Sequence, residues 1–135
     1  MNIFFINTAI IVGAGPVGCM LACFLAQKHS HLFPGGIEIY ERRKDTRTLG
    51  NADAGRSINL AISDRSFYTM QQLDPTMLDE ILSDKLGVKM KGRYIHDKTG
   101  KKCEFQYYGR EDQFILSVNR RWLNEWLQTR AEKHK

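Results

Sequence analysis

The feature that most constrains this chain is a glycine-rich segment at residues 13–18, which reads GAGPVG and matches the pattern GxGxxG. It directly follows a short apolar run at 8–12, which is typical of a buried parallel strand. Beyond it, apolar residues recur at helical spacing, and small residues occupy the adjoining face. A glycine turn between a strand and a helix is the context in which this pattern binds a dinucleotide.

Each glycine of the segment has its own expected role. Gly13 permits the tight turn, Gly15 lets the backbone approach a pyrophosphate, and Gly18 removes a side chain where helix and strand pack. The N–H groups at the start of the helix then face the phosphates. Pro16 is compatible with this arrangement because proline is tolerated in the first turn of a helix.

A carboxylate completes the pattern at the end of a second predicted strand, 37–40, so that strand, helix and strand form a βαβ unit. Glu41 follows this strand and can accept hydrogen bonds from both ribose hydroxyls of an adenosine. Because a carboxylate repels a 2′-phosphate, FAD or NAD is favoured over NADP at this position, and the motif leaves these two open. Arg42 and Arg43 come next and can either neutralise phosphates or be solvated.

The remaining residues predict a different arrangement of elements. A polar stretch at 42–56 indicates a loop, and Ser63 is the expected N-cap of a helix that carries Phe67, Met70 and Leu73. Pro75 interrupts that helix before a second helical segment at 77–82.

Strands are expected at 93–96 and 104–107, on either side of a turn at 97–100. A last strand at 114–118 leads to a helix capped by Asn119, and the predicted buried stripe of that helix is Trp122, Leu123, Trp126 and Leu127. We therefore predict an α/β fold, with a Rossmann-type βαβ unit followed by the start of a second β-sheet.

Composition narrows the range of functions. The net charge of +5 is spread along the chain without a run of five like charges, which disfavours a nucleic-acid partner. The three cysteines, Cys19, Cys23 and Cys103, form no CxxC pair, so neither a disulfide framework nor a zinc site is expected. The apolar start at 1–6 runs into the first strand and is not expected to be a signal peptide, and no stretch is long enough to span a bilayer.

Several segments of the sequence carry a resemblance to a known family. Residues 55–63, GRSINLAIS, are similar to the GRSINLALS stretch of the kynurenine 3-monooxygenases, which are FAD-dependent aromatic-ring hydroxylases. Residues 93–96 (RYIH), 100–102 (GKK), 108–109 (YG) and 113–120 (QFILSVNR) recur in the same order. The similarity extends over nearly all of residues 8–133.

The resemblance implies hydroxylation of L-kynurenine at ring position 3 with FAD, NADPH and O₂, in tryptophan degradation and pyridine nucleotide biosynthesis. Together with the glycine motif, it predicts these cofactor-binding residues: Gly13, Gly15, Val17, Gly18, Tyr40, Glu41, Arg42, Arg43, Ala61 and Arg120. Arg93 matches an arginine that holds the substrate carboxylate. Its partner is Tyr107 or Tyr108, of which only one can face the site, and we predict Tyr108.

The resemblance also indicates what this chain lacks. The family's later flavin-contacting segment, most of its substrate sheet and its membrane-associated carboxyl-terminal helices have no counterpart here. We expect residues 1–135 to be an amino-terminal FAD-binding portion that does not hydroxylate kynurenine by itself, from an enzyme of the mitochondrial outer membrane. No catalytic acid or base and no metal ligand is predicted. The rival interpretations are a non-catalytic dinucleotide-binding module and half of an NAD-dependent dehydrogenase domain.

Overall fold

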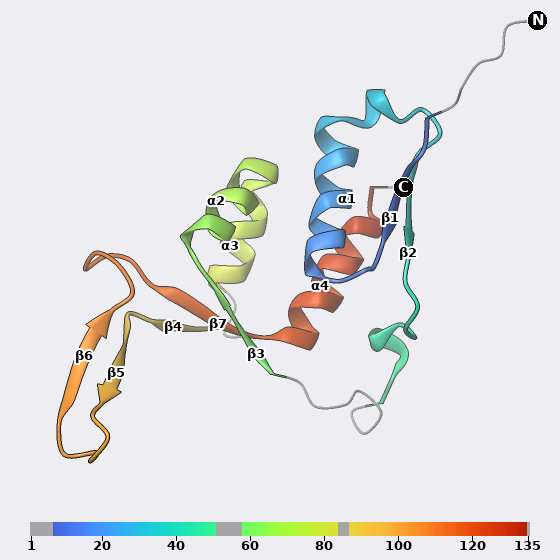
Figure 1. The fold of residues 1–135 in the computed structure, drawn as a ribbon. Coiled ribbons are helices and arrows are strands. Elements are labelled where there is room, and N and C mark those ends of the chain that lie inside the picture. Colours follow the sequence, from blue (N-terminus) through green and yellow to red (C-terminus); the bar gives the residue numbers. More distant parts are fainter. Residues whose placement is uncertain (1–6, 51–57, 84–86, 135) are drawn as a thin grey trace, which may run out of the picture. The chain divides into compact units, whose positions relative to one another are not determined.

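The computed structural model describes residues 7–50, 58–83 and 87–134 (Figure 1). The apolar start at 1–6 and the first three residues of the GRSINLAIS stretch lie outside the described residues. The chain forms two compact units, one built from the amino-terminal part together with residues 120–134, and the other from residues 58–119. Both parallel and antiparallel strands are present, which confirms the predicted α/β class.

The first unit contains the predicted βαβ arrangement. Its elements are β1 (Ala9–Val12), α1 (Pro16–Lys28), the 3-10 turn η1 (Ser30–Leu32), β2 (Ile37–Tyr40), the 3-10 turn η2 (Thr46–Thr48) and α4 (Arg120–Glu132). Strands β1 and β2 pair in parallel, with Ala9 opposite Ile37 and Val12 opposite Tyr40. Helix α4 packs beside α1, although residues 29–119 separate them in the sequence (Figure 1).

Helix α1 packs through its small side chains rather than through its large apolar stripe. Cys19, Ala22 and Cys23 are buried, whereas Val17 is 82% exposed and Phe24 is 40% exposed. Small residues allow α1 to lie close to its neighbours. The packed face of α1 is therefore the face of small residues that adjoins the large apolar stripe. Burial raises the pKa of the Cys19 thiol to about 11, and both cysteines of the helix are free thiols in the core, as expected.

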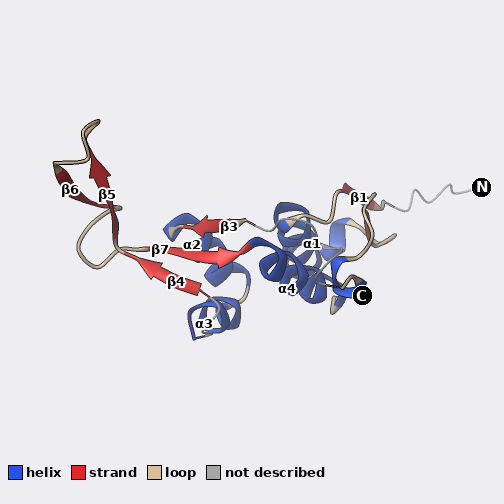
Figure 2. Cartoon of the chain, turned by 90° about the horizontal axis from the view of Figure 1, so that it is seen from below, coloured by secondary structure: helices blue, strands red, loops and turns tan. Residues whose placement is uncertain are grey.

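The second unit is built on an antiparallel sheet. Its elements are β3 (Asn59–Ile62), α2 (Asp64–Leu73), α3 (Pro75–Ser83), β4 (Gly87–Met90), β5 (Gly92–His96), β6 (Cys103–Tyr107) and β7 (Ile115–Asn119). Strand β7 lies between β3 and β4 and pairs antiparallel with both (Figure 2). The core lies between this sheet and the two helices, where Met77, Ile81, Leu116 and Val118 are each 1% exposed.

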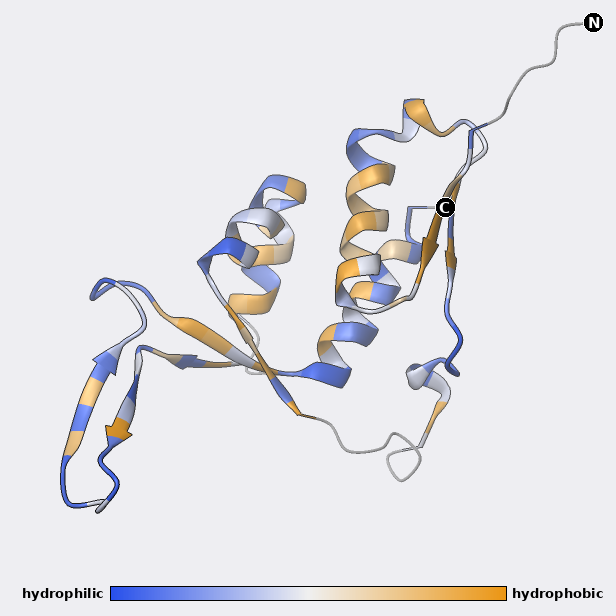
Figure 3. Cartoon of the chain, in the orientation of Figure 1, coloured by the Kyte–Doolittle hydropathy of each residue, from blue (hydrophilic) through white to orange (hydrophobic). Residues whose placement is uncertain are grey.

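Strands β5 and β6 form the predicted hairpin, and each begins one residue earlier than expected. Arg93 is paired with Gln106, and Tyr94 with Phe105. The hairpin carries alternating apolar and polar residues along β6 (Figure 3). In the turn, the Asp97 carboxylate accepts hydrogen bonds from the Thr99 hydroxyl and from backbone N–H groups beyond it.

Three local predictions need adjustment. Pro75 begins α3 rather than preceding it, as expected for a residue whose missing N–H costs nothing in the first turn of a helix. The last strand is β7, Ile115–Asn119, one residue later at each end than expected, and Asn119 directly precedes α4, at the position predicted for its cap. The stripe of α4 is only partly buried: Leu123 and Leu127 are in the core, whereas the two tryptophans of the stripe stack on each other and stay partly exposed. Among the described residues, no helix is long and apolar enough to cross a membrane.

Candidate functional site

The glycine turn between β1 and α1 has the geometry that its sequence predicts. Gly13 has φ +108°, a conformation that favours glycine, and its N–H donates to the Tyr40 carbonyl at 2.7 Å. A Cβ on Gly18 would lie 2.0 Å from the Gly13 oxygen, so helix and turn can approach only without a side chain there. A Cβ on Gly15 would meet nothing within 4 Å. The turn is therefore closed beneath Gly18 and open beside Gly15.

The start of α1 supplies hydrogen-bond donors at this open turn. The first backbone bond of the helix runs from the Cys19 N–H to the Gly15 carbonyl at 3.0 Å. Pro16 has no N–H, and the N–H groups of Val17 and Gly18 precede the first intrahelical bond, so they have no acceptor within the helix. Together with the positive end of the helix dipole, these groups suit an anionic ligand such as a diphosphate.

Glu41 joins the end of β2 to the glycine turn. One of its carboxylate oxygens accepts the Ala14 N–H at 3.0 Å, and the other accepts the Arg43 N–H at 2.8 Å. The Arg43 guanidinium also spans the carboxylate, with Nε 3.0 Å from Oε1 and Nη2 3.2 Å from Oε2. This guanidinium is the main reason why the pKa of Glu41 is lowered to about 2, and the two N–H groups act in the same direction.

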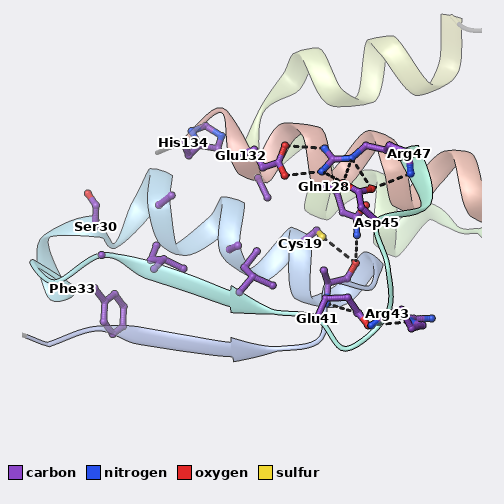
Figure 4. A pocket seen from close by; sticks show the side chains of 17 residues that line it. Cys19, Ser30, Phe33, Glu41, Arg43, Asp45, Arg47, Gln128, Glu132 and His134 are labelled. Atoms are coloured by element: carbon purple, nitrogen blue, oxygen red, sulfur yellow. Dashed lines mark hydrogen bonds and ion pairs between the residues drawn. The ribbon is translucent and has the colours of Figure 1, made fainter. Parts of the chain in front are cut away.

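A cavity of about 580 Å³ opens beside the turn, within the first unit (Figure 4). One wall consists of small and apolar side chains of α1 and β2, including Cys19, Ala22 and Ile39. Charged and polar side chains gather at the other side, where they come from the residues after β2, from α4 and from the residues that follow α4: Glu41, Arg43, Asp45, Arg47, Gln128, Glu132 and His134. The cavity thus combines an apolar floor with a polar rim, as small-molecule sites commonly do.

An ion-pair network ties the loop after β2 to α4. Arg47 donates to Asp45 at 2.6 Å and, through two nitrogens, to Glu132 at 2.7 and 2.8 Å. Near the other end of α4, Arg121 donates to the carbonyls of Thr46 and Leu49 at 2.8 and 2.9 Å. The Gln128 amide of the same helix donates to the Ala14 carbonyl at 3.2 Å. Helix α4 therefore holds both the glycine turn and the loop that carries Arg43.

The lowered pKa of Glu41 predicts a pH dependence of stability. A carboxyl whose folded-state pKa lies below its ordinary value of 4.5 stabilises the fold above that value, and the contribution is lost as pH falls toward about 2. We expect the free energy of unfolding, measured by urea denaturation at several pH values, to decline over this window. Glu41→Gln should flatten that part of the profile, whereas Glu38→Gln, which neutralises a carboxylate on β2, should leave that part of the profile unchanged. An unchanged profile in Glu41→Gln would contradict the assigned interactions.

The predicted cofactor residues fall into two groups. The glycine turn, Val17, Tyr40, Glu41 and Arg43 come together at the carboxyl ends of β1 and β2. Arg42 follows Glu41 and is exposed, and Arg120 is the exposed first residue of α4 in the same unit. Ala61 lies on β3 and belongs to the second unit.

The predicted substrate residues lie on the hairpin of the second unit. The Arg93 guanidinium donates to the Gln106 side-chain oxygen at 2.9 Å, across the strand pair. Tyr107 lies on the opposite face, where its ring contacts that of Phe105 at 4.9 Å between centroids. The N–H of Tyr108 donates to the Lys91 carbonyl at 3.0 Å and extends the ladder by one residue. Tyr108 itself directly follows β6, two residues after Gln106, the residue opposite Arg93.

Sequence reasoning did not identify the contribution of α4 to the site. Gln128 and Glu132 are four residues apart on one helical face, a spacing that marks a polar side of α4 but not its partner. Arg47 is 85 residues away from Glu132, and nothing in the local sequence indicates that they pair. Among the described residues there is no cluster of side chains that could hold a metal ion.

A glycine turn, an open helix N-terminus and a carboxylate directly after the next strand define the first unit as a Rossmann-type βαβ unit. The same fold occurs in a Diels-Alderase of pyrroindomycin biosynthesis, with a TM-score of 0.62 and 20% identity over 95% of this chain and 24% of that one. It also occurs in a geranylgeranyl bacteriochlorophyll reductase-like protein from Thermoplasma acidophilum, with a TM-score of 0.56 and 17% identity over 95% of this chain and 28% of that one.

Sequence comparison identifies the family. The chain is 42% identical over 128 residues to the kynurenine 3-monooxygenase of Candida albicans, 44% over 123 residues to that of Caenorhabditis elegans, and 38% over 124 residues to that of Sus scrofa. These alignments cover 94%, 91% and 92% of this chain, respectively, and 26%, 24% and 24% of the relatives. No family model matches the chain. The chain belongs to the kynurenine 3-monooxygenase family and spans about a quarter of the length of these relatives.

Proposed function

We propose that residues 1–135 form the FAD-binding portion of a kynurenine 3-monooxygenase and hold the adenosine diphosphate half of the cofactor. The observation that carries the proposal is the contact of Glu41 with the Ala14 N–H, because it brings the acceptor for a ribose to the turn that suits a diphosphate. The diphosphate would lie against the N–H groups at the start of α1, and Arg42, Arg43 and Arg120 add positive charge in the same unit.

The residues present fit this half of FAD. The turn is open beside Gly15, where a backbone must approach the phosphates, and a carboxylate rather than a basic side chain stands at the ribose position. A negative charge at Glu41 disfavours the 2′-phosphate of NADPH at the same place. We therefore assign this site to FAD and treat NADPH as a co-substrate bound elsewhere. When bound, the flavin supplies the redox chemistry, and the protein orients it and excludes water.

For the second unit we propose a role in holding the substrate. Arg93 can offer a forked pair of donors to the carboxylate of L-kynurenine, which is the geometry that guanidinium groups provide best. The alternation along β6 supports Tyr108, rather than Tyr107, as the tyrosine that shares the face of Arg93. We place the whole enzyme at the mitochondrial outer membrane on the strength of the family resemblance alone.

Isothermal titration of the purified 135-residue chain tests the assignment to FAD. We expect FAD and ADP to bind, AMP to bind more tightly than 2′,5′-ADP, which differs from AMP only by its 2′-phosphate, and NADH to bind more weakly than FAD. A preference for NADH over FAD would favour a dehydrogenase half-domain instead, and an absence of ADP binding would remove the nucleotide site. No kynurenine-dependent oxidation of NADPH is expected from this chain alone. Observing it would contradict the proposal that these residues hold only the adenosine diphosphate half of the cofactor.

A further inference from the structure

The carboxylate at the proposed ribose position already has its hydrogen-bonding capacity filled. A carboxylate offers about four lone-pair positions. Four donors address Glu41: the N–H groups of Ala14 and Arg43, and the Nε and Nη2 of the Arg43 side chain, at 2.8 to 3.2 Å. The two hydroxyls of an adenosine ribose would bring two more donors. One pair must leave before the ribose can be bound.

The two donors of the Arg43 guanidinium are the ones that can move away from the carboxylate. The N–H donors of Ala14 and Arg43 are fixed by the backbone of the glycine turn and of the residues after β2. The Arg43 side chain is 62% exposed, whereas the Glu41 side chain is 20% exposed, so the arginine can rotate into solvent while the carboxylate stays. Ion pairs of this partly exposed kind contribute little to stability, and breaking one costs correspondingly little.

We propose that the Arg43 guanidinium occupies the ribose-binding positions of Glu41 in the free protein and is displaced by the ribose hydroxyls when nucleotide binds. Arg43 thereby determines how strongly this site distinguishes a ribose from a sugar without hydroxyls. The inference rests on the proposed function, since it concerns the same nucleotide site. It adds an exchange at Glu41 that the binding of a diphosphate at the glycine turn does not require.

The test compares ADP with 2′,3′-dideoxy-ADP on the full chain by isothermal titration. The ratio of their dissociation constants isolates the hydroxyls, because contacts of Arg43 with phosphates or base affect both ligands alike. In Arg43→Ala the hydroxyls meet free acceptors, so we expect the ratio to rise about three- to fivefold above that of the unmodified chain. Lys44→Ala, which removes one exposed positive charge from the same loop, should leave the ratio unchanged.

Arg43→Lys provides a second comparison that keeps the charge. A lysine cannot bridge both carboxylate oxygens, so its ratio should also rise, but by less than that of Arg43→Ala. An unchanged or lower ratio in both Arg43 variants, or an equal rise in Lys44→Ala, contradicts the proposed displacement of Arg43 by the ribose. Neither result contradicts the proposed nucleotide site itself. If the unmodified chain binds neither ADP nor its dideoxy analogue, the proposed function fails, and the exchange fails with it.

Discussion

Replacing Gly18 with alanine is expected to destabilise the first unit by about 3 kcal/mol and to abolish nucleotide binding. The added Cβ would lie 2.0 Å from the Gly13 carbonyl oxygen and 3.2 Å from its carbon, and both are backbone atoms that no side-chain rotation can move away. The turn cannot shift freely, because the Gly13 N–H is bonded to the Tyr40 carbonyl and thus to β2. Urea denaturation of the full chain measures the loss.

Gly15→Ala is the matched control, since it adds the same methyl group to the same turn. Its Cβ would meet nothing within 4 Å and the residue has a negative φ, so we expect stability close to that of the unmodified chain. If a diphosphate approaches the backbone at Gly15, this variant nevertheless binds ADP more weakly. Equal stability of Gly18→Ala and Gly15→Ala would contradict the close packing described here.

Replacing Glu41 with alanine is expected to weaken ADP binding about tenfold to a hundredfold. Hydrogen bonds to a charged acceptor contribute about 1.5–3 kcal/mol each, and the variant also removes the acceptor of the Ala14 N–H. The loss should fall on the hydroxyls, so that ADP and its dideoxy analogue bind with nearly equal affinity to Glu41→Ala. Isothermal titration with both ligands measures this directly.

The same variant should lose its discrimination against a 2′-phosphate, because the repelling negative charge is gone. We expect 2′,5′-ADP to gain in affinity relative to AMP in Glu41→Ala. Glu38→Gln removes a charge from β2, just before Glu41, while its side chain can still accept the hydrogen bond from the Tyr40 hydroxyl, and it should bind ADP normally. Unaltered ADP binding by Glu41→Ala would show that the carboxylate is not the ribose acceptor.

Much of the first unit could be predicted because its signals are local. A continuous apolar run, a glycine turn and a helical repeat follow one another within thirty residues, and each depends on the conformational preferences of neighbouring residues. The roles of Gly13 and Gly18 follow from the same local geometry, and the structure bears them out with a positive φ and a close backbone contact. The hairpin was predictable for the same reason, since a turn signal stands between two alternating segments.

The apolar stripe of α1 shows where this reasoning stops. Periodicity identifies faces of a helix but does not decide which face is packed, and here Cys19 and Ala22 are buried whereas Val17 is exposed. Hydrophobicity alone would favour burial of the face that carries the large apolar side chains. The small face is the buried one because it lets α1 approach its neighbours more closely, a property of two surfaces together.

Local sequence patterns determined the βαβ unit, the glycine turn and the carboxylate after β2, because each results from residues that are close along the chain. Only the tertiary structure decided that α4 completes the site, through Gln128 at the turn and Glu132 on Arg47. It also decided that the Arg43 guanidinium donates two hydrogen bonds to the Glu41 carboxylate. Which side chains pair depends on their distances in the folded chain. Periodicity in the sequence does not contain these distances, so it cannot predict which donor pairs with a given acceptor.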